Sequence, residues 1–181
     1  MRIDYVNQQI MAAMLDGCPE VRYAAMPPSS AARGKTPRII SASGTVAYVL
    51  EESEIYFNLS RCGEEPGSFK PLVEDPDLTR IDNMLDPTMD IRVMPTGVSA
   101  LRAALTGESR TRLAARFKGA AWDTFVDVDL LEAFDEAKYY QSKKNGPVAV
   151  VEDGKLAGFV MPCKAGDAEG HYTDTPSYED E

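Results

Sequence analysis

Two short apolar runs near the end of the chain give its clearest structural pattern. Residues 148–151 and 156–161 are mostly apolar and flank the pair Asp153-Gly154. An Asp-Gly pair favours the positive φ angles that a tight hairpin turn requires. The pattern therefore predicts a β-hairpin over residues 147–161, with its turn at Gly154. We expect four of its side chains in the core, namely Val148, Val150, Leu156 and Phe159.

Three further short runs, residues 38–42, 45–50 and 55–60, are rich in Ile, Val, Tyr and Phe. Polar or small residues separate them, as is typical of strands joined by turns. We therefore predict a three-stranded antiparallel meander over residues 38–60. The middle run is apolar at both odd and even positions, so we expect it to be covered on both faces.

Helical spacing is clearest at the start of the chain. Ile3, Val6, Ile10 and Met14 recur as one face of a helix, and Gly17 follows where a helix commonly ends. These positions predict an amphipathic helix over residues 4–16.

The second half of the chain alternates between the two patterns. Residues 98–105 and 113–117 have apolar positions spaced as on a helix, with Thr106-Gly107 between them, and residues 122–128 alternate as in a half-buried strand. The next stretch predicts a helix over residues 129–144, because Asp129 and Glu132 form an Asp-x-x-Glu capping pattern ahead of helically spaced apolar residues.

Three stretches have no regular pattern. Residues 17–37 and 61–90 are rich in Pro and polar residues, and a loop as long as 61–90 predicts a functional flap or a boundary between two subdomains. Residues 164–181 form an acidic tail with few apolar residues, which we expect to be poorly ordered.

Together these elements predict an α+β fold. We expect an antiparallel or mixed sheet of about five to six strands, built from the 38–60 meander and the 147–161 hairpin, with helices packed on one face. Residues 1–163 are expected to form a single domain.

Composition narrows the classes of function. The chain has 181 residues, a formal net charge of −10 and an apolar fraction of 44%. An acidic surface repels nucleic acid and anionic membranes, so a basic partner, or no partner, suits it better. No stretch resembles a signal peptide core or a membrane span. Three widely spaced cysteines without a Cys-x-x-Cys pair favour a reducing compartment, and we expect a cytoplasmic protein.

Familiar catalytic and cofactor motifs are incomplete. Residues 29–36 end in Gly-Lys-Thr, but they lack the first glycine, the preceding strand and the following helix of a phosphate-binding loop. The only histidine, His171, lies in the acidic tail, and together with Cys18, Cys62 and Cys163 it lacks the close ligand spacing of a zinc site. We therefore predict no cofactor.

Asp127 and Asp129 form an Asp-x-Asp pair that is a weak candidate metal site. Carboxylate oxygens suit Mg²⁺ or Mn²⁺, and residues two apart on a strand project from the same face. The alternative is structural, with Asp129 serving as the N-cap of the following helix. We favour the structural interpretation.

One segment of the chain is rich in basic residues, although the net charge of the chain is negative. A basic island comprises Arg102, Arg110, Arg112, Arg116 and Lys118. Two short helices joined by a glycine turn could present these side chains to phosphates, or the side chains could pair with the protein's own carboxylates. A smaller basic group, Arg33, Lys35 and Arg38, would strengthen the case for an anionic ligand if it folded beside the island.

The sequence thus favours a non-enzymatic cytoplasmic binding or regulatory protein that self-associates, because good fold signals accompany no complete catalytic constellation. One alternative is a nucleic-acid-binding protein that uses residues 102–118. Another is a metal-dependent enzyme that uses Asp127 and Asp129.

Overall fold

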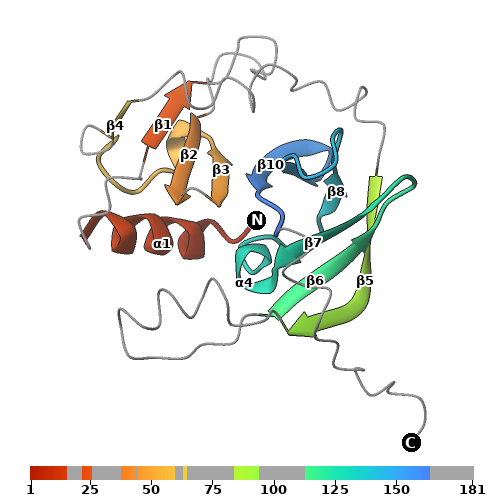
Figure 1. The fold of residues 1–181 in the computed structure, drawn as a ribbon. Coiled ribbons are helices and arrows are strands. Elements are labelled where there is room, and N and C mark those ends of the chain that lie inside the picture. Colours follow the sequence, from red (N-terminus) through yellow and green to blue (C-terminus); the bar gives the residue numbers. More distant parts are fainter. Residues whose placement is uncertain are drawn as a thin grey trace, which may run out of the picture.

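The computed structural model describes residues 1–15, 22–25, 38–43, 45–59, 63–64, 84–93 and 113–163. Figure 1 shows the arrangement of its helices and strands. Their bounds in chain order are α1 Ile3–Leu15, β1 Arg22–Ala25, β2 Arg38–Ser43, β3 Val46–Leu50, the 3₁₀ turn η2 Glu52–Glu54, β4 Gly63–Glu64, β5 Met84–Val93, β6 Leu113–Lys118, β7 Asp123–Asp127, α4 Val128–Leu131, β8 Lys138–Tyr140, β9 Val148–Glu152 and β10 Lys155–Val160.

The strands form one hydrogen-bonded series of ten, in the order β4-β1-β2-β3-β10-β9-β8-β5-β6-β7. All neighbours are antiparallel except β1 and β4, which are parallel. The predicted α+β class and mixed sheet therefore hold in coarse form. The predicted strand number of five to six is too low, and the described chain has only two α-helices, one of them four residues long.

The series curls back on itself at its β7 end. The amide of Cys163, just after β10, donates to the Phe125 carbonyl of β7 at 2.8 Å, and the two residues form an isolated antiparallel bridge. The six strands β5 to β10 thereby enclose a small, nearly closed barrel, and β1 to β4 extend the sheet beyond it.

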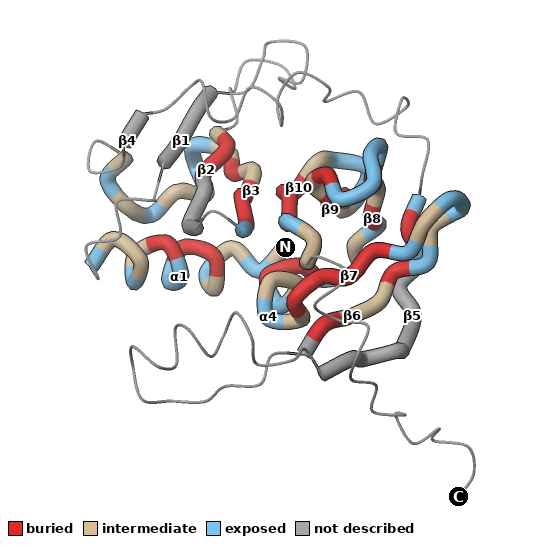
Figure 2. The backbone as a smooth tube through the Cα atoms, viewed as in Figure 1, coloured by how far each residue is buried: buried red, intermediate tan, exposed pale blue. Residues whose placement is uncertain are grey.

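The core lies inside this curl and against α1. Its largest cluster draws buried residues from both halves of the chain, from Val6 and Ile10 of α1 to Val160 of β10. Figure 2 shows this buried interior in red. A second cluster lies on the other face of β2, β3, β9 and β10, so neighbours such as Ile39 and Ile40 are both fully buried. The expectation that the 45–50 run is covered on both faces is confirmed.

The predicted hairpin is also confirmed. β9 and β10 pair from Lys155↔Glu152 to Val160↔Val148, and the turn places Asp153 at φ 49° and Gly154 at φ 74°. Val148, Val150 and Phe159 are buried as predicted, whereas Leu156 is only half-buried.

The prediction of a third strand in the meander, over residues 55–60, is wrong. After β3 the chain forms η2 and then passes α1 without strand pairing. The cause is buried Asn7, whose Nδ2 donates to the Glu54 carbonyl at 2.8 Å and whose Oδ1 accepts from the Tyr56 amide at 2.9 Å. Ile55, Phe57 and Leu59 still pack on the core cluster.

Two helix predictions are also wrong. Residues 113–118 form β6, and residues 129–144 contain only the end of α4 before β8 begins at Lys138. Residues four apart share a face in a strand as well as in a helix, so the 113–117 spacing was ambiguous. The predicted loop 61–90 contains β4 and the start of β5, and the segment 98–105 and the tail 164–181 lie outside the described residues.

Candidate functional site

Three segments far apart in sequence converge at one end of the barrel. They are the start of β5, the β6–β7 turn and the β8–β9 turn. Met84 is opposite Tyr140, the last residue of β8, and Asp86 is opposite Lys118, the last residue of β6. In Figure 1, β7 runs from its turn with β6 to α4, so α4 lies at the other end of that strand.

A fully buried glutamine joins the two turns. Gln141 Oε1 accepts from the Trp122 indole Nε1 at 2.6 Å and from the Thr124 hydroxyl, while Gln141 Nε2 donates to the Gly146 carbonyl at 2.7 Å. Burying an amide is favourable only when such partners satisfy it. The network therefore fixes the β6–β7 turn against the β8–β9 turn.

The backbone of each turn is also constrained. The Gly119 amide donates to the Trp122 carbonyl at 3.1 Å, and a Cβ added at Gly119 would lie 2.5 Å from that carbonyl oxygen. In the other turn Asn145 has φ 61°, a left-handed conformation that asparagine tolerates, and the Gly146 amide donates to the Lys143 carbonyl at 2.8 Å. These contacts constrain the backbone of both turns.

This end exposes apolar and basic groups together, and one exposed carboxylate, Asp86, lies opposite Lys118. Met84 is 56% exposed, Trp122 is half-buried, and Figure 2 shows the β6–β7 turn in pale blue as exposed. We call the group the turn surface, and its members are Met84, Lys118, Ala120, Ala121, Trp122, Lys143 and Lys144. Within the described ranges, the ammonium groups of Lys118, Lys143 and Lys144 are exposed and form no ion pair.

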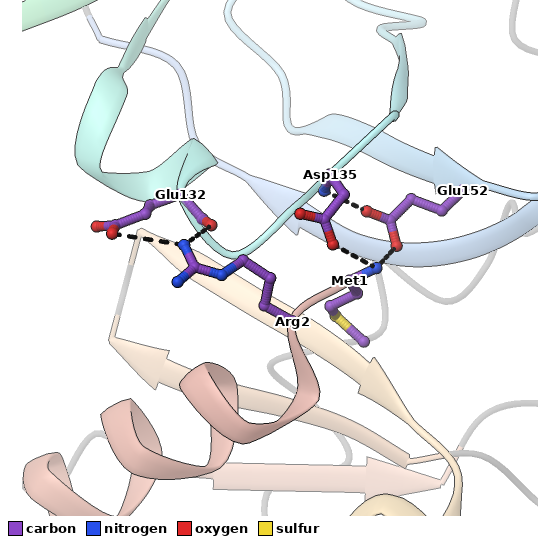
Figure 3. Close-up of polar contacts among 5 residues, drawn as sticks. All are labelled: Met1, Arg2, Glu132, Asp135 and Glu152. Atoms are coloured by element: carbon purple, nitrogen blue, oxygen red, sulfur yellow. Dashed lines mark hydrogen bonds and ion pairs between the residues drawn. The ribbon is translucent and has the colours of Figure 1, made fainter.

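The opposite end has a different character (Figure 3). Arg2 Nη1 donates to the Glu132 carbonyl at 3.3 Å and lies 3.6 Å from Glu132 Oε1, and the Tyr5 hydroxyl donates to Glu132 Oε2 at 3.0 Å. The Met1 amino group pairs with Glu152 and, at 3.5 Å, with Asp135. Burial lowers the pKa of this amino group, but the bond and charge of Glu152 and the charge of Asp135 outweigh burial and raise it above 8.0.

Carboxylates dominate the exposed part of this end. We call Asp129, Glu132, Asp135 and Glu136 the α4 surface, and all four side chains are exposed. Glu132 and Asp135 have the partners just described. In the described part of the chain, the carboxylates of Asp129 and Glu136 form no ion pair. The exposed basic side chains at this end of the described chain are Arg2, Lys138 opposite Val151, and Lys155 opposite Glu152. The four exposed carboxylates outnumber them, so this end has an excess of negative charge.

Two of the five residues of the predicted basic island lie in the described part of the chain. Arg116 lies in β6 and its guanidinium binds Asp123 of β7, with Nε donating to Oδ2 at 2.9 Å, so at this position the alternative of pairing with the protein's own carboxylate is confirmed. Lys118 is exposed and belongs to the turn surface. Arg102, Arg110 and Arg112 lie outside the described residues.

Arg38 is the only member of the smaller basic group among the described residues, and its strand does not pair with the strand of the basic island. Arg38 begins β2, and five strands separate β2 from β6 in the sheet order. Arg33 and Lys35 lie outside the described residues, so the remainder of this prediction stays a prediction.

Asp127, not Asp129, is the helix cap. Asp127 is 6% exposed and its Oδ1 accepts from the Asp129 amide at 3.1 Å at the N-terminus of α4. Asp129 is exposed inside the helix, so the predicted cap is two residues too late, and the two carboxylates do not share one strand. No group of three potential metal-ligating side chains occurs among the described residues, where Cys163 is half-buried.

No family model, curated protein or solved structure matches this chain. Its own geometry is therefore the basis for any functional conclusion. In the ranges that the structure describes, no helix is long and apolar enough to cross a membrane.

Sequence reasoning missed most of the turn surface. It placed Lys143 and Lys144 at the end of a long helix, whereas they lie in a turn after β8. The signal was present in Tyr139 and Tyr140, because adjacent tyrosines favour a strand. The strand predicted over residues 122–128 occurs as Asp123–Asp127, so Trp122 lies just before it in the β6–β7 turn. The bond from Trp122 to Gln141 depends on tertiary structure.

Proposed function

We propose that this chain is a non-enzymatic binding protein that acts by holding another protein, and that it self-associates. The observation that supports this proposal is the turn surface. A half-buried tryptophan and an exposed methionine stand among three unpaired lysines on two rigidly joined turns.

The composition of this surface fits a protein partner. Aromatic residues and methionine are enriched where proteins bind each other, and a side chain that is already fixed loses little entropy on binding. The Gln141 network supplies that fixation for Trp122. The lysines favour a partner segment that combines carboxylates with apolar side chains.

A nucleic-acid-binding function is the second candidate. Lysines beside an aromatic ring can also hold a single strand by phosphate contact and base stacking. Two observations weigh against it. Arg116 is already paired with Asp123, and the net charge of −10 opposes binding that depends on phosphate contacts.

Trp122 provides the test, because it is the only tryptophan in the chain. The purified protein is titrated with a synthetic peptide rich in glutamate and leucine, and separately with a single-stranded oligonucleotide. We expect the peptide to change Trp122 emission, with an affinity that falls with added salt and is lost in the Lys143→Glu, Lys144→Glu variant.

Lys155→Glu is the matched control, since it reverses one exposed lysine at the α4 end of the barrel and should leave peptide binding unchanged. A salt-sensitive response to the oligonucleotide alone would favour the second candidate. If neither probe affects the emission, the turn surface is not a binding surface.

A further inference from the structure

The two ends of the barrel carry opposite charge. At the turn end, the three lysines of the turn surface outnumber the exposed carboxylate of Asp86. At the other end, the four exposed carboxylates of the α4 surface outnumber the side chains of Arg2, Lys138 and Lys155. β7 separates them, and a strand of its length spans about 17 Å. The two surfaces on one molecule therefore face different directions and cannot meet each other.

Both surfaces also have an apolar component. Met84 and Trp122 lie among the lysines. In α4, Leu130 and Leu131 pack on the core cluster and leave part of their surface exposed among the carboxylates. Contacts between proteins commonly place apolar groups at the centre with charged groups around them. The pattern is complementary in charge and similar in apolar character.

We propose that the turn surface of one copy binds the α4 surface of a second copy, head to tail. This inference rests on the proposed function and names the partner. The carboxylates of Asp129 and Glu136, which form no ion pair in the described chain, would lie against lysines that are equally unpaired. Because the two surfaces differ, the contact is heterologous and repeats into a ring or an open chain.

The acidic net charge sets the conditions under which the contact forms. Two copies with a charge of −10 each repel one another over about 30 Å at 0.01 M salt, but over only about 10 Å at 0.1 M salt. Charges in direct contact are less affected by this screening until the salt approaches about 1 M. Association is therefore strongest at intermediate salt.

Charge reversal tests the contact. One variant carries Lys143→Glu and Lys144→Glu, and the other carries Glu132→Lys and Glu136→Lys. Sedimentation equilibrium in about 0.1 M salt should show a concentration-dependent increase in mass for the unmodified chain. Each variant alone should associate at least about tenfold more weakly, which corresponds to about 1.4 kcal/mol.

Mixing the two variants should restore association. The new acidic turn surface then meets the new basic α4 surface, and the two unchanged surfaces also meet. Circular dichroism and the melting temperature of each variant show whether it is folded. A mixture that stays monomeric while both variants are folded overturns the head-to-tail contact.

The peptide titration separates the two proposals. If the acidic peptide binds the turn surface but the unmodified chain remains a monomer at every concentration and salt, the protein-binding function stands, and both self-association and the second copy as the partner are overturned. If the chain associates but neither charge reversal weakens it, the contact lies elsewhere on the molecule.

Discussion

Single residues at turns set the geometry on which the rest of the fold depends. Gly154 has φ 74° in the β9–β10 turn, and nothing lies within 4 Å of a Cβ added there. The cost of a side chain at this position is therefore conformational strain and not a clash. This turn could be predicted from the sequence, because the preference of Asp-Gly for positive φ is local.

Gly154→Val should destabilise the protein by about 1 kcal/mol or more, since a β-branched residue is strained at positive φ. Gly154→Asn is the control, because asparagine adopts this conformation at a smaller cost. Urea unfolding of both variants measures the difference. Equal midpoints for the valine variant and the unmodified chain would contradict the turn geometry.

Tyr48 makes stability depend on alkaline pH. It is 4% exposed, and burial raises its pKa to about 12 from 10.0. The folded state thus retains the proton longer than the unfolded state, so this contribution is complete below pH 10 and is lost as the pH rises toward 12. A difference of about two pKa units corresponds to about 2 to 3 kcal/mol.

Tyr48→Phe should therefore unfold less readily than the unmodified chain above about pH 10, with little difference at pH 7. Melting curves across this pH range compare the two proteins. Tyr5 and Tyr139 also have raised pKa values, because of burial and neighbouring glutamates, so the comparison rests on the difference between the two curves. Parallel curves would show that Tyr48 is not a buried neutral group in the folded state.

At the scale of elements, the local sequence pattern predicts the secondary structure correctly where a single periodicity dominates. It fails where tertiary contacts determine whether a segment becomes a helix or a strand. The N-terminal helix was predicted over 4–16 and occurs as Ile3–Leu15. Residues 129–144 satisfied a helical spacing, yet Phe134 packs on Tyr48 with ring centroids 5.9 Å apart, and the chain turns into β8. That packing partner is more than eighty residues away in the sequence and leaves no local signal.

The cap of α4 illustrates the same limit. Asp127→Ala should cost about 1 kcal/mol or more, because the Asp129 amide would lose its acceptor. Asp129→Ala removes an exposed carboxylate and should change stability much less. Chemical denaturation of the two variants distinguishes the cap seen here from the cap that the Asp-x-x-Glu pattern predicts, which would reverse the order.

Gln141 joins the two turns, and no pattern in the sequence indicates this role. Gln141→Leu conserves much of the volume but leaves the Trp122 indole, the Thr124 hydroxyl and the Gly146 carbonyl without their partner. We expect a loss of about 2 kcal/mol or more and a shift of Trp122 emission. Thr124→Val, which removes one partner of three, should cost less. An unchanged emission in Gln141→Leu would mean that the turns are not held together in this way.

For the whole molecule, the sheet order decides which predicted site residues can act together. It brings Lys118 beside a turn that carries two lysines, which the sequence pattern had placed in a helix. In the sheet order it leaves five strands between β6 and β2, the strand that Arg38 begins. Net charge and composition were read directly from the sequence. The division of that charge between two ends of a barrel follows from strand pairing over long separations, which spacing alone does not encode.

The most direct test of the account is hydrogen exchange of the unmodified chain at low and at high protein concentration in about 0.1 M salt. Association through the proposed contact should slow exchange in the β6–β7 and β8–β9 turns and around α4. Slower exchange confined to other segments, or identical exchange in a sample that sedimentation shows to be associated, would contradict the assignment of the turn surface as the binding surface.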